Sequence, residues 1–297
     1  MTWKPILVGV DATLEAARAA AFGERLAEAA GTRCVLLHVV STPAPPPAAW
    51  SEPRMPAAPS REAHARETVL HALWGTVSPR LLQELEVRTG RAPVALREAA
   101  IELDADVIVL GRKRHTVVGQ WLGYGTALHL ARTAEVPLLV TSGAALPARV
   151  LAAVDTSAAA RPTLDAAQRM AELCGAALRV LSVVELLPVT GNMAAAYFDV
   201  STYYDSSRTE IERDVWPLVT MAAAQKQLRF GHPLETILDE AEAWAADLVV
   251  VGTHGKGWVE RTLLGSVTER LLRLLPASML VVPAHAALAA AGQGSAG

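Results

Sequence analysis

Cysteine is nearly absent from this sequence of 297 residues. The two cysteines, Cys34 and Cys174, stand in apolar segments where predicted helices end or predicted strands begin. That placement is typical of buried thiols rather than of a disulfide framework, and it favours a reducing compartment. No Cys/His spacing resembles a zinc site, and His64 and His71 are too far apart to pair on one turn of a helix. We therefore expect a cytoplasmic protein without a structural metal.

The sequence also lacks long apolar runs and an excess of either charge. No uncharged apolar run reaches the roughly 18 residues that a membrane helix needs, and the first ten residues are too short and too strand-like for a signal peptide. The net charge of −3 gives no electrostatic case for a nucleic-acid partner. With 52% hydrophobic residues, the chain is expected to be globular.

The chain repeats itself, which is its strongest organisational feature. The segment Ile6–Asp11, an apolar run that ends in a carboxylate, has a counterpart in Val150–Asp155. Three further pairs lie 141 residues apart: Gly90 and Gly231, Asp106 and Asp247, and Gly111 and Gly252. Repeats of this length predict two similar domains, 1–146 and 147–286, followed by a disordered tail at 287–297.

Each half alternates short apolar strands with helices. Ile6–Asp11, a helix capped by Thr13 and ended by Gly31, and the strand Cys34–Val40 form a βαβ unit, which predicts a parallel sheet. Continued along both halves, the pattern predicts an α/β fold of two tandem Rossmann-like domains, each with five parallel strands and four helices. Arg61–Leu85 is expected to be one long helix, with an interruption near Gly75 or Pro79.

Seven prolines interrupt this pattern between residues 41 and 60. Proline is excluded from helix and sheet interiors, so this stretch is expected to be an exposed loop. It is either a plain insertion or a proline-rich ligand for a partner protein.

The most informative stretch of the sequence is a glycine motif in the second half. Gly252, Gly255 and Gly265 follow the apolar strand 247–251, and Ser266 and Val267 then open a helix. Glycine lets backbone N–H groups approach an anion, and the first N–H groups of a helix have no internal partner. This strand–loop–helix frame favours a phosphate site over a simple turn. His254 and Lys256, inside the loop, either touch the phosphate or are solvated.

The first half departs from the motif. Gly111 is kept, but Arg114 stands where the second glycine belongs, and the helix-opening pair aligns with Tyr124-Gly125 rather than with glycine and serine. The basic run 112–115 could attract an anion or be merely solvated. We predict one competent nucleotide site, in the second half.

These residues resemble the universal stress protein family, and the chain resembles a tandem member over nearly all of 1–285. The resemblance implies the fold of the adenine nucleotide alpha hydrolases and a site for ATP or ADP, with or without Mg²⁺. It implies that Asp155 and Val183 line the adenosine end and that the phosphates lie on Gly252, Gly255, Gly265, Ser266 and Val267. The first-half equivalents of the adenosine residues are Asp11 and Val39. Such a protein would act as a stress-response or signalling module.

Little in the sequence predicts catalysis. There is no GxxxxGK[ST] motif, Ser266 has no identifiable histidine partner, and Asp155 is the only carboxylate expected near the nucleotide. Binding with slow or no turnover is therefore expected. The alternatives are a slow ATPase and a nucleotide-independent scaffold that recruits an unknown protein through the proline-rich loop or the aromatic segment 197–204.

The last strand of each half is expected at a sheet edge, where backbone N–H and C=O groups are free to pair with another strand. These strands are Val136–Thr141 and Ser278–Val282. The resemblance implies dimerisation through this strand, so the two halves are expected to form a pseudo-dimer within the chain. Pairing of whole chains into a homodimer is left open.

Overall fold

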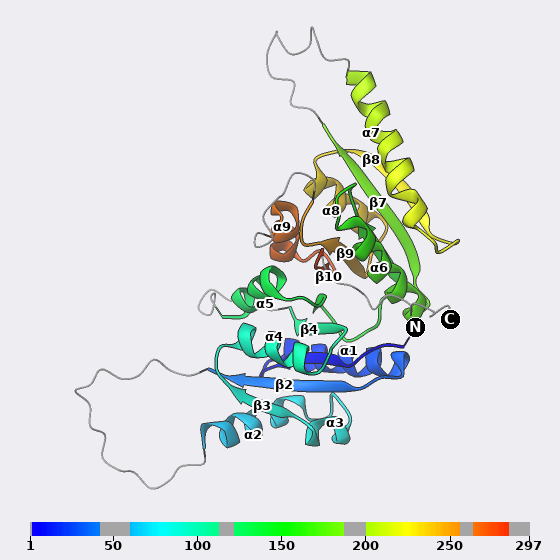
Figure 1. Ribbon diagram of the computed structural model, residues 1–297. Coiled ribbons are helices and arrows are strands. Elements are labelled where there is room, and N and C mark those ends of the chain that lie inside the picture. The colour runs from blue at the N-terminus through cyan, green and yellow to red at the C-terminus, as the bar shows by residue number, and fades with distance from the viewer. Residues whose placement is uncertain (1, 42–59, 113–121, 187–199, 256–263, 285–297) are drawn as a thin grey trace, which may run out of the picture. The chain divides into compact units, whose positions relative to one another are not determined.

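The computed structural model describes residues 2–41, 60–112, 122–186, 200–255 and 264–284 (Figure 1). Contacts divide the chain into two compact units, one centred on residues 2–130 and the other on the described residues from 146 onward. Several predicted features lie outside the described residues: most of the proline-rich loop, Arg114, Lys256, the first two aromatic residues of 197–204, and the tail.

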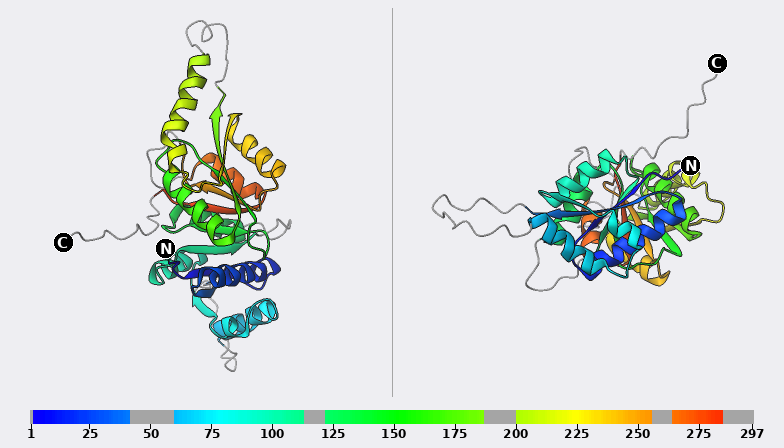
Figure 2. Two further views of the ribbon diagram at one scale, coloured as in Figure 1. Left: turned by 90° about the vertical axis from the view of Figure 1, so that its right-hand side faces the viewer. Right: turned by 90° about the horizontal axis from the view of Figure 1, so that it is seen from below.

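Both halves alternate strands and helices (Figures 1 and 2). The elements of the first half are β1 (Ile6–Val10), α1 (Leu14–Ala30), β2 (Cys34–Val40), α2 (Arg61–Leu73), α3 (Pro79–Gln83), β3 (Glu86–Thr89), α4 (Ala92–Glu102), β4 (Val107–Gly111), α5 (Leu122–Thr133) and β5 (Leu138–Thr141). Those of the second half are β6 (Arg149–Ala153), α6 (Ala160–Cys174), β7 (Ala177–Glu185), α7 (Val200–Asp214), the 3-10 helix η1 (Trp216–Leu218), β8 (Gln225–Gly231), α8 (Pro233–Ala243), β9 (Leu248–Gly252), α9 (Ser266–Leu274) and β10 (Ser278–Val282).

The strand order repeats between the halves. It is β3-β2-β1-β4-β5 in the first and β8-β7-β6-β9-β10 in the second. Each strand pair whose register is described runs parallel. The first strand of each half therefore lies between its second and fourth strands. The direction of winding reverses there, and open α/β sheets bind their ligands at this position. Asp11 directly follows β1, and Asp155 lies two residues beyond the end of β6.

Helices cover both faces of the first sheet, as two close contacts show. A Cβ atom on Gly23 of α1 would overlap the side chain of Val8, whereas one on Gly9 would come within 3.1 Å of Leu96 on α4. Successive residues of a strand point to opposite faces, so α1 and α4 lie on opposite faces of β1. This arrangement explains why β1 and β4 are apolar throughout.

Local signals set the helix ends. The hydroxyl of Thr13 accepts a hydrogen bond from the backbone N–H of Ala16 (3.2 Å), and Gly31 ends α1 at φ 62°. The long helix expected over Arg61–Leu85 is broken: Gly75 has φ 74°, and Ser78 caps a separate helix that has Pro79 in its first turn. The helix is therefore interrupted at both predicted sites, Gly75 and Pro79.

A buried polar cluster ties α8 to the outer strands of the second sheet. Glu240 is 6% exposed and accepts from Arg179 of β7 (2.6 Å) and from Arg229 of β8 (3.1 Å). The Arg179 guanidinium also lies 4.4 Å from the centre of the Trp244 ring. These contacts fix the position of α8, which forms one wall of the cavity described below.

Both cysteines are free thiols; Cys34 is buried and Cys174 is partly buried. The expectation of unpaired thiols is therefore confirmed. Burial, with a smaller contribution from the charge of Glu24, raises the pKa of Cys34 to about 12, and burial raises the pKa of Cys174 to about 11. Among the described helices, none combines the length and apolar character that a bilayer crossing demands.

We expect the native protein to resist thiol reagents. The thiolate is the reactive form, and at pH 8 a pKa near 11 leaves about one thiolate per thousand molecules. Ellman's reagent should therefore label both cysteines quickly in urea but only slowly in the folded protein. Rapid labelling of either cysteine without denaturant would contradict the assigned burial.

Candidate functional site

A cavity of about 660 Å³ opens in the second unit beside the carboxyl ends of β6, β7 and β9. Pockets for small organic ligands have about 300–1,000 Å³. Its lining includes every site residue predicted from the sequence: Asp155, Val183, Gly252, Gly255, Gly265, Ser266 and Val267. The fold thus brings together residues that lie up to 112 positions apart in the chain.

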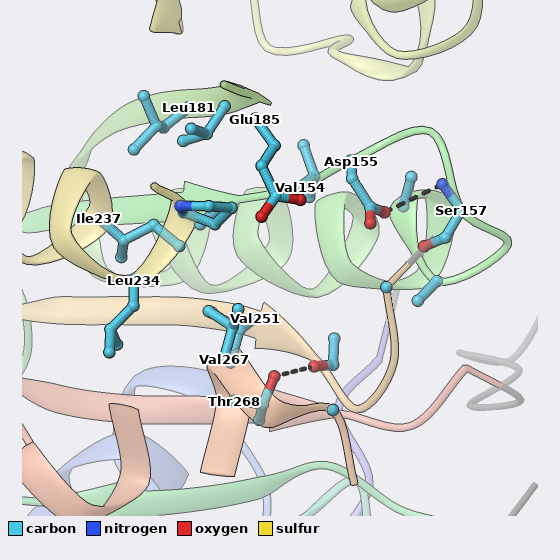
Figure 3. Close-up of a pocket in the computed structure, with 18 of the residues that line it drawn as sticks. Val154, Asp155, Ser157, Leu181, Glu185, Leu234, Ile237, Val251, Val267 and Thr268 are labelled. Atoms are coloured by element: carbon cyan, nitrogen blue, oxygen red, sulfur yellow. Dashed lines mark hydrogen bonds between the residues drawn. The ribbon is translucent and has the colours of Figure 1, made fainter. Parts of the chain in front are cut away.

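The glycine motif forms a closed turn between β9 and α9. The Gly265 N–H donates to the carbonyl of Thr253 (2.7 Å), and the Thr268 hydroxyl donates to the carbonyl of Gly252 (2.8 Å; Figure 3). Gly265 is the N-cap and Ser266 the first residue of α9, as predicted. Because the Gly265 N–H is already used, the N–H groups of the first turn of α9 are the helix donors that an anion could use among the residues the structure describes here.

Two glycines of the motif stand at close contacts. A Cβ on Gly252 would lie 2.8 Å from the Cβ of Ala159, and one on Gly255 would lie 2.8 Å from Oδ2 of Asp155. Gly252 therefore lets β9 approach α6, and Gly255 lets the loop approach the carboxylate. The sequence indicated the glycines but not these contacts.

Asp155 holds the turn that leads out of β6. Its Oδ1 accepts from the backbone N–H of Ser157 (3.0 Å; Figure 3), and its Oδ2 faces Gly255. Helix α6 begins only at Ala160, with Ala159 as an N-cap that makes no side-chain bond. Neither Thr156 nor Ser157 caps this helix, and Thr156 instead donates to Glu210 (2.8 Å).

Three polar atoms around the cavity have no hydrogen-bond partner among the described residues. They are Ser157 Oγ, Thr163 Oγ1 and His254 Nε2, and each is buried. The other ring nitrogen of His254 is occupied by the Thr253 hydroxyl (2.9 Å), and Thr163 is only 1% exposed. A buried polar group without a partner is costly, so these atoms indicate room for a polar ligand.

The opposite end of the cavity is apolar. Leu234 and Ile237 of α8 lie on the side away from Asp155 and Ser157 in Figure 3, and Leu181 of β7 lies above them. One face of α7 contributes Tyr203, Ser207 and Ile211, which follow the i, i+4, i+8 spacing of a helix face. The cavity thus has an apolar end and a polar end.

Among the described residues, two carboxylates besides Asp155 line the cavity, namely Glu185 at the end of β7 and Glu235 in the first turn of α8. The prediction that Asp155 would be the only one is wrong. Glu185 could have been found, because it follows Val183 by two residues at a predicted strand end. No local sequence pattern predicts that Glu235 and the other α8 side chains line the cavity. Within the described ranges, no group of three His, Cys, Asp or Glu side chains is arranged to hold a metal.

The first half shares the aspartate turn and the close approach at the end of its fourth strand, but it departs at the helix opening. Asp11 accepts from the N–H (3.1 Å) and the hydroxyl (2.5 Å) of Thr13, within its own turn. A Cβ on Gly111 would overlap the backbone carbonyl of Glu15. Helix α5 already begins at Leu122, so Gly125 lies inside the helix rather than at its opening.

Comparison with known proteins agrees with the fold. The model of the universal stress protein family matches twice, over residues 2–142 and 148–283. The chain belongs to the universal stress protein family. Since both halves match, it is a tandem member with two such domains.

Individual relatives and solved structures are similar to this chain to different extents. A universal stress protein of Mycolicibacterium smegmatis is 27% identical over 297 aligned residues, which cover 93% of this chain and 96% of that protein. The crystal structure of a universal stress protein from Archaeoglobus fulgidus covers 94% of this chain and 98% of its own, with a TM-score of 0.60 and 16% identity, which supports the fold alone. Another solved universal stress protein, in complex with cAMP, covers 46% of this chain and 98% of its own, with a TM-score of 0.34 and 21% identity.

Proposed function

We propose that the second domain of this universal stress protein binds ATP or ADP, and that occupancy of the site is the signal the protein delivers. The observation that carries the proposal is the polarity of the cavity. One end presents the N-terminus of α9 and three buried polar atoms that lack partners among the described residues, and the other end is apolar. A nucleotide has the same division between its phosphates and its base.

The phosphates belong at the glycine end. The first-turn N–H groups of α9, at Ser266, Val267 and Thr268, have no acceptor within the helix, and the helix dipole favours an anion there. Arg270, one turn further along α9, adds a positive charge to the cavity lining. The hydroxyl of Thr163 and Nε2 of His254 would gain partners from a bound ligand.

The base belongs at the apolar end, between the side chains of α8 and the backbone of Val183. Hydrogen bonds to charged phosphate contribute about 1.5–3 kcal/mol each. Three or four of them, after the cost of association, correspond to about 8 kcal/mol, or roughly micromolar affinity.

The test is thermal unfolding with and without ATP and Mg²⁺, together with calorimetric titration by ATP, ADP and cAMP. At a ligand concentration of 100 Kd the folded state gains about 2.7 kcal/mol, which raises the melting temperature by roughly 5–10 °C for a domain of this size. Extraction of the purified protein first establishes whether a nucleotide is already bound. A folded, nucleotide-free protein with no shift and no heat of binding would refute the proposal.

A further inference from the structure

We propose that Glu185 accepts hydrogen bonds from the two hydroxyl groups of a ribose, so that the site selects ribonucleotides over deoxyribonucleotides. This inference rests on the proposed function and adds a residue that determines its specificity. It starts from a carboxylate inside a cavity otherwise suited to an anion, where a negative charge weakens phosphate binding unless it has a role of its own.

The position of Glu185 fits the middle of a bound nucleotide. It is the last residue of β7, two residues beyond Val183. In the view of Figure 3 its carboxylate points into the cavity, between Leu234 and Ile237 on one side and Asp155 and Ser157 on the other. A nucleotide with its base at the apolar end and its phosphates at the glycine end would place its sugar there.

The backbone of Glu185 is held while its carboxylate is not. The residue pairs with Gly231 of β8, and its carbonyl accepts from the Tyr203 hydroxyl (3.3 Å). In the part of the chain that the structure describes, the carboxylate oxygens make no hydrogen bond or ion pair. The oxygens are therefore presented from a fixed strand end and are available to a ligand.

A carboxylate matches a vicinal diol, because its two oxygens accept and the two hydroxyls donate. In dinucleotide-binding folds a carboxylate also hydrogen-bonds the ribose 2′-hydroxyl, although there it follows the glycine-rich turn, whereas Glu185 precedes the glycine motif. Asp155 is less suited to this role, since Oδ1 accepts from Ser157 and Oδ2 faces Gly255. Glu235 belongs to α8, on the wall that carries the apolar side chains.

The experiment is calorimetric titration of the full chain with ATP, 2′-deoxy-ATP and 3′-deoxy-ATP, using the wild type, Glu185→Ala and Glu235→Ala. Either variant removes one negative charge from the cavity lining, which favours all three triphosphates, but Glu185→Ala alone also removes the proposed hydrogen bonds to the ribose of ATP. The informative quantity is therefore the ratio of affinities. We expect the wild type to prefer ATP over each deoxy form by about 10-fold or more, the effect of one hydrogen bond to a charged group.

In Glu185→Ala the ratio should fall to about 1, and in Glu235→Ala it should stay at the wild-type value. Glu185 is exposed to solvent, so the variant should unfold at the wild-type temperature without ligand. Equal binding of ATP and its deoxy forms by the wild type, or an unchanged ratio in Glu185→Ala, overturns this inference and leaves the proposed function standing. Failure of the wild type to bind any of the three refutes the proposed function, and this inference with it.

Discussion

Replacing Gly255 with glutamate is expected to lower the affinity for ATP at least 100-fold. Even the Cβ of the new side chain would lie 2.8 Å from Oδ2 of Asp155, so either the Asp155 side chain or the loop has to move. The added carboxylate would also stand beside the N-terminus of α9, where the phosphates are proposed to bind, and like charges repel in a partly desolvated site. In titration calorimetry the heat of ATP binding should disappear at concentrations that saturate the wild type.

The matched control is Gly125→Glu, which adds the same charge to the first half. A Cβ at Gly125 meets no atom within 4 Å, so the fold should tolerate the change. Thermal unfolding of both variants without ligand separates a lost site from a lost fold. If Gly125→Glu abolished ATP binding and Gly255→Glu did not, the nucleotide would belong to the first half.

Replacing Gly111 with alanine is expected to destabilise the first unit by about 3 kcal/mol, since overpacking of a well-packed interior typically costs 1–3 kcal/mol or somewhat more. The new methyl group would overlap the backbone carbonyl of Glu15, which cannot move aside as a side-chain end could. For a domain of this size the melting temperature should fall by about 10 °C. Urea-induced unfolding, followed by circular dichroism, would measure the loss independently.

The same substitution at Gly125 should have the opposite sign. Gly125 lies in α5 with open space around its Cα, and alanine is favoured over glycine inside a helix by about 0.5–1 kcal/mol. Gly125→Ala should therefore leave the first unit slightly more stable. An unchanged melting temperature for Gly111→Ala would mean that the close approach of β4 to α1 is not a requirement of the fold.

The first glycine of the motif has the same packing role in both halves. Gly111 and Gly252 end the fourth strand of their respective halves, and both allow that strand to approach the first helix of its half. Packing alone therefore explains the first glycine of the motif. The remaining glycines, Gly255 and Gly265, occur in the second half alone, and they carry the case for an anion.

Much of the fold could be predicted because its signals are local. The predicted strand Cys34–Val40 agrees with β2 at both ends, and Thr13 and Gly31 bound α1 as expected. Apolar periodicity and capping residues act within one or two turns of the chain, so they can be recognised without knowledge of distant residues. Because the sequence repeats, the same elements are predicted for the second half.

The sequence by itself determined the two α/β domains, the family and the strand–loop–helix frame of the glycine motif. Only the tertiary structure decided that Gly265 uses its N–H to close the loop, that Asp155 faces Gly255, and that Glu185 enters the cavity. The physical reason is that the cavity walls come from strands and helices far apart in the chain. Their side chains come into contact only when a parallel sheet brings the carboxyl ends of its strands to one edge. Local sequence patterns do not predict such long-range contacts.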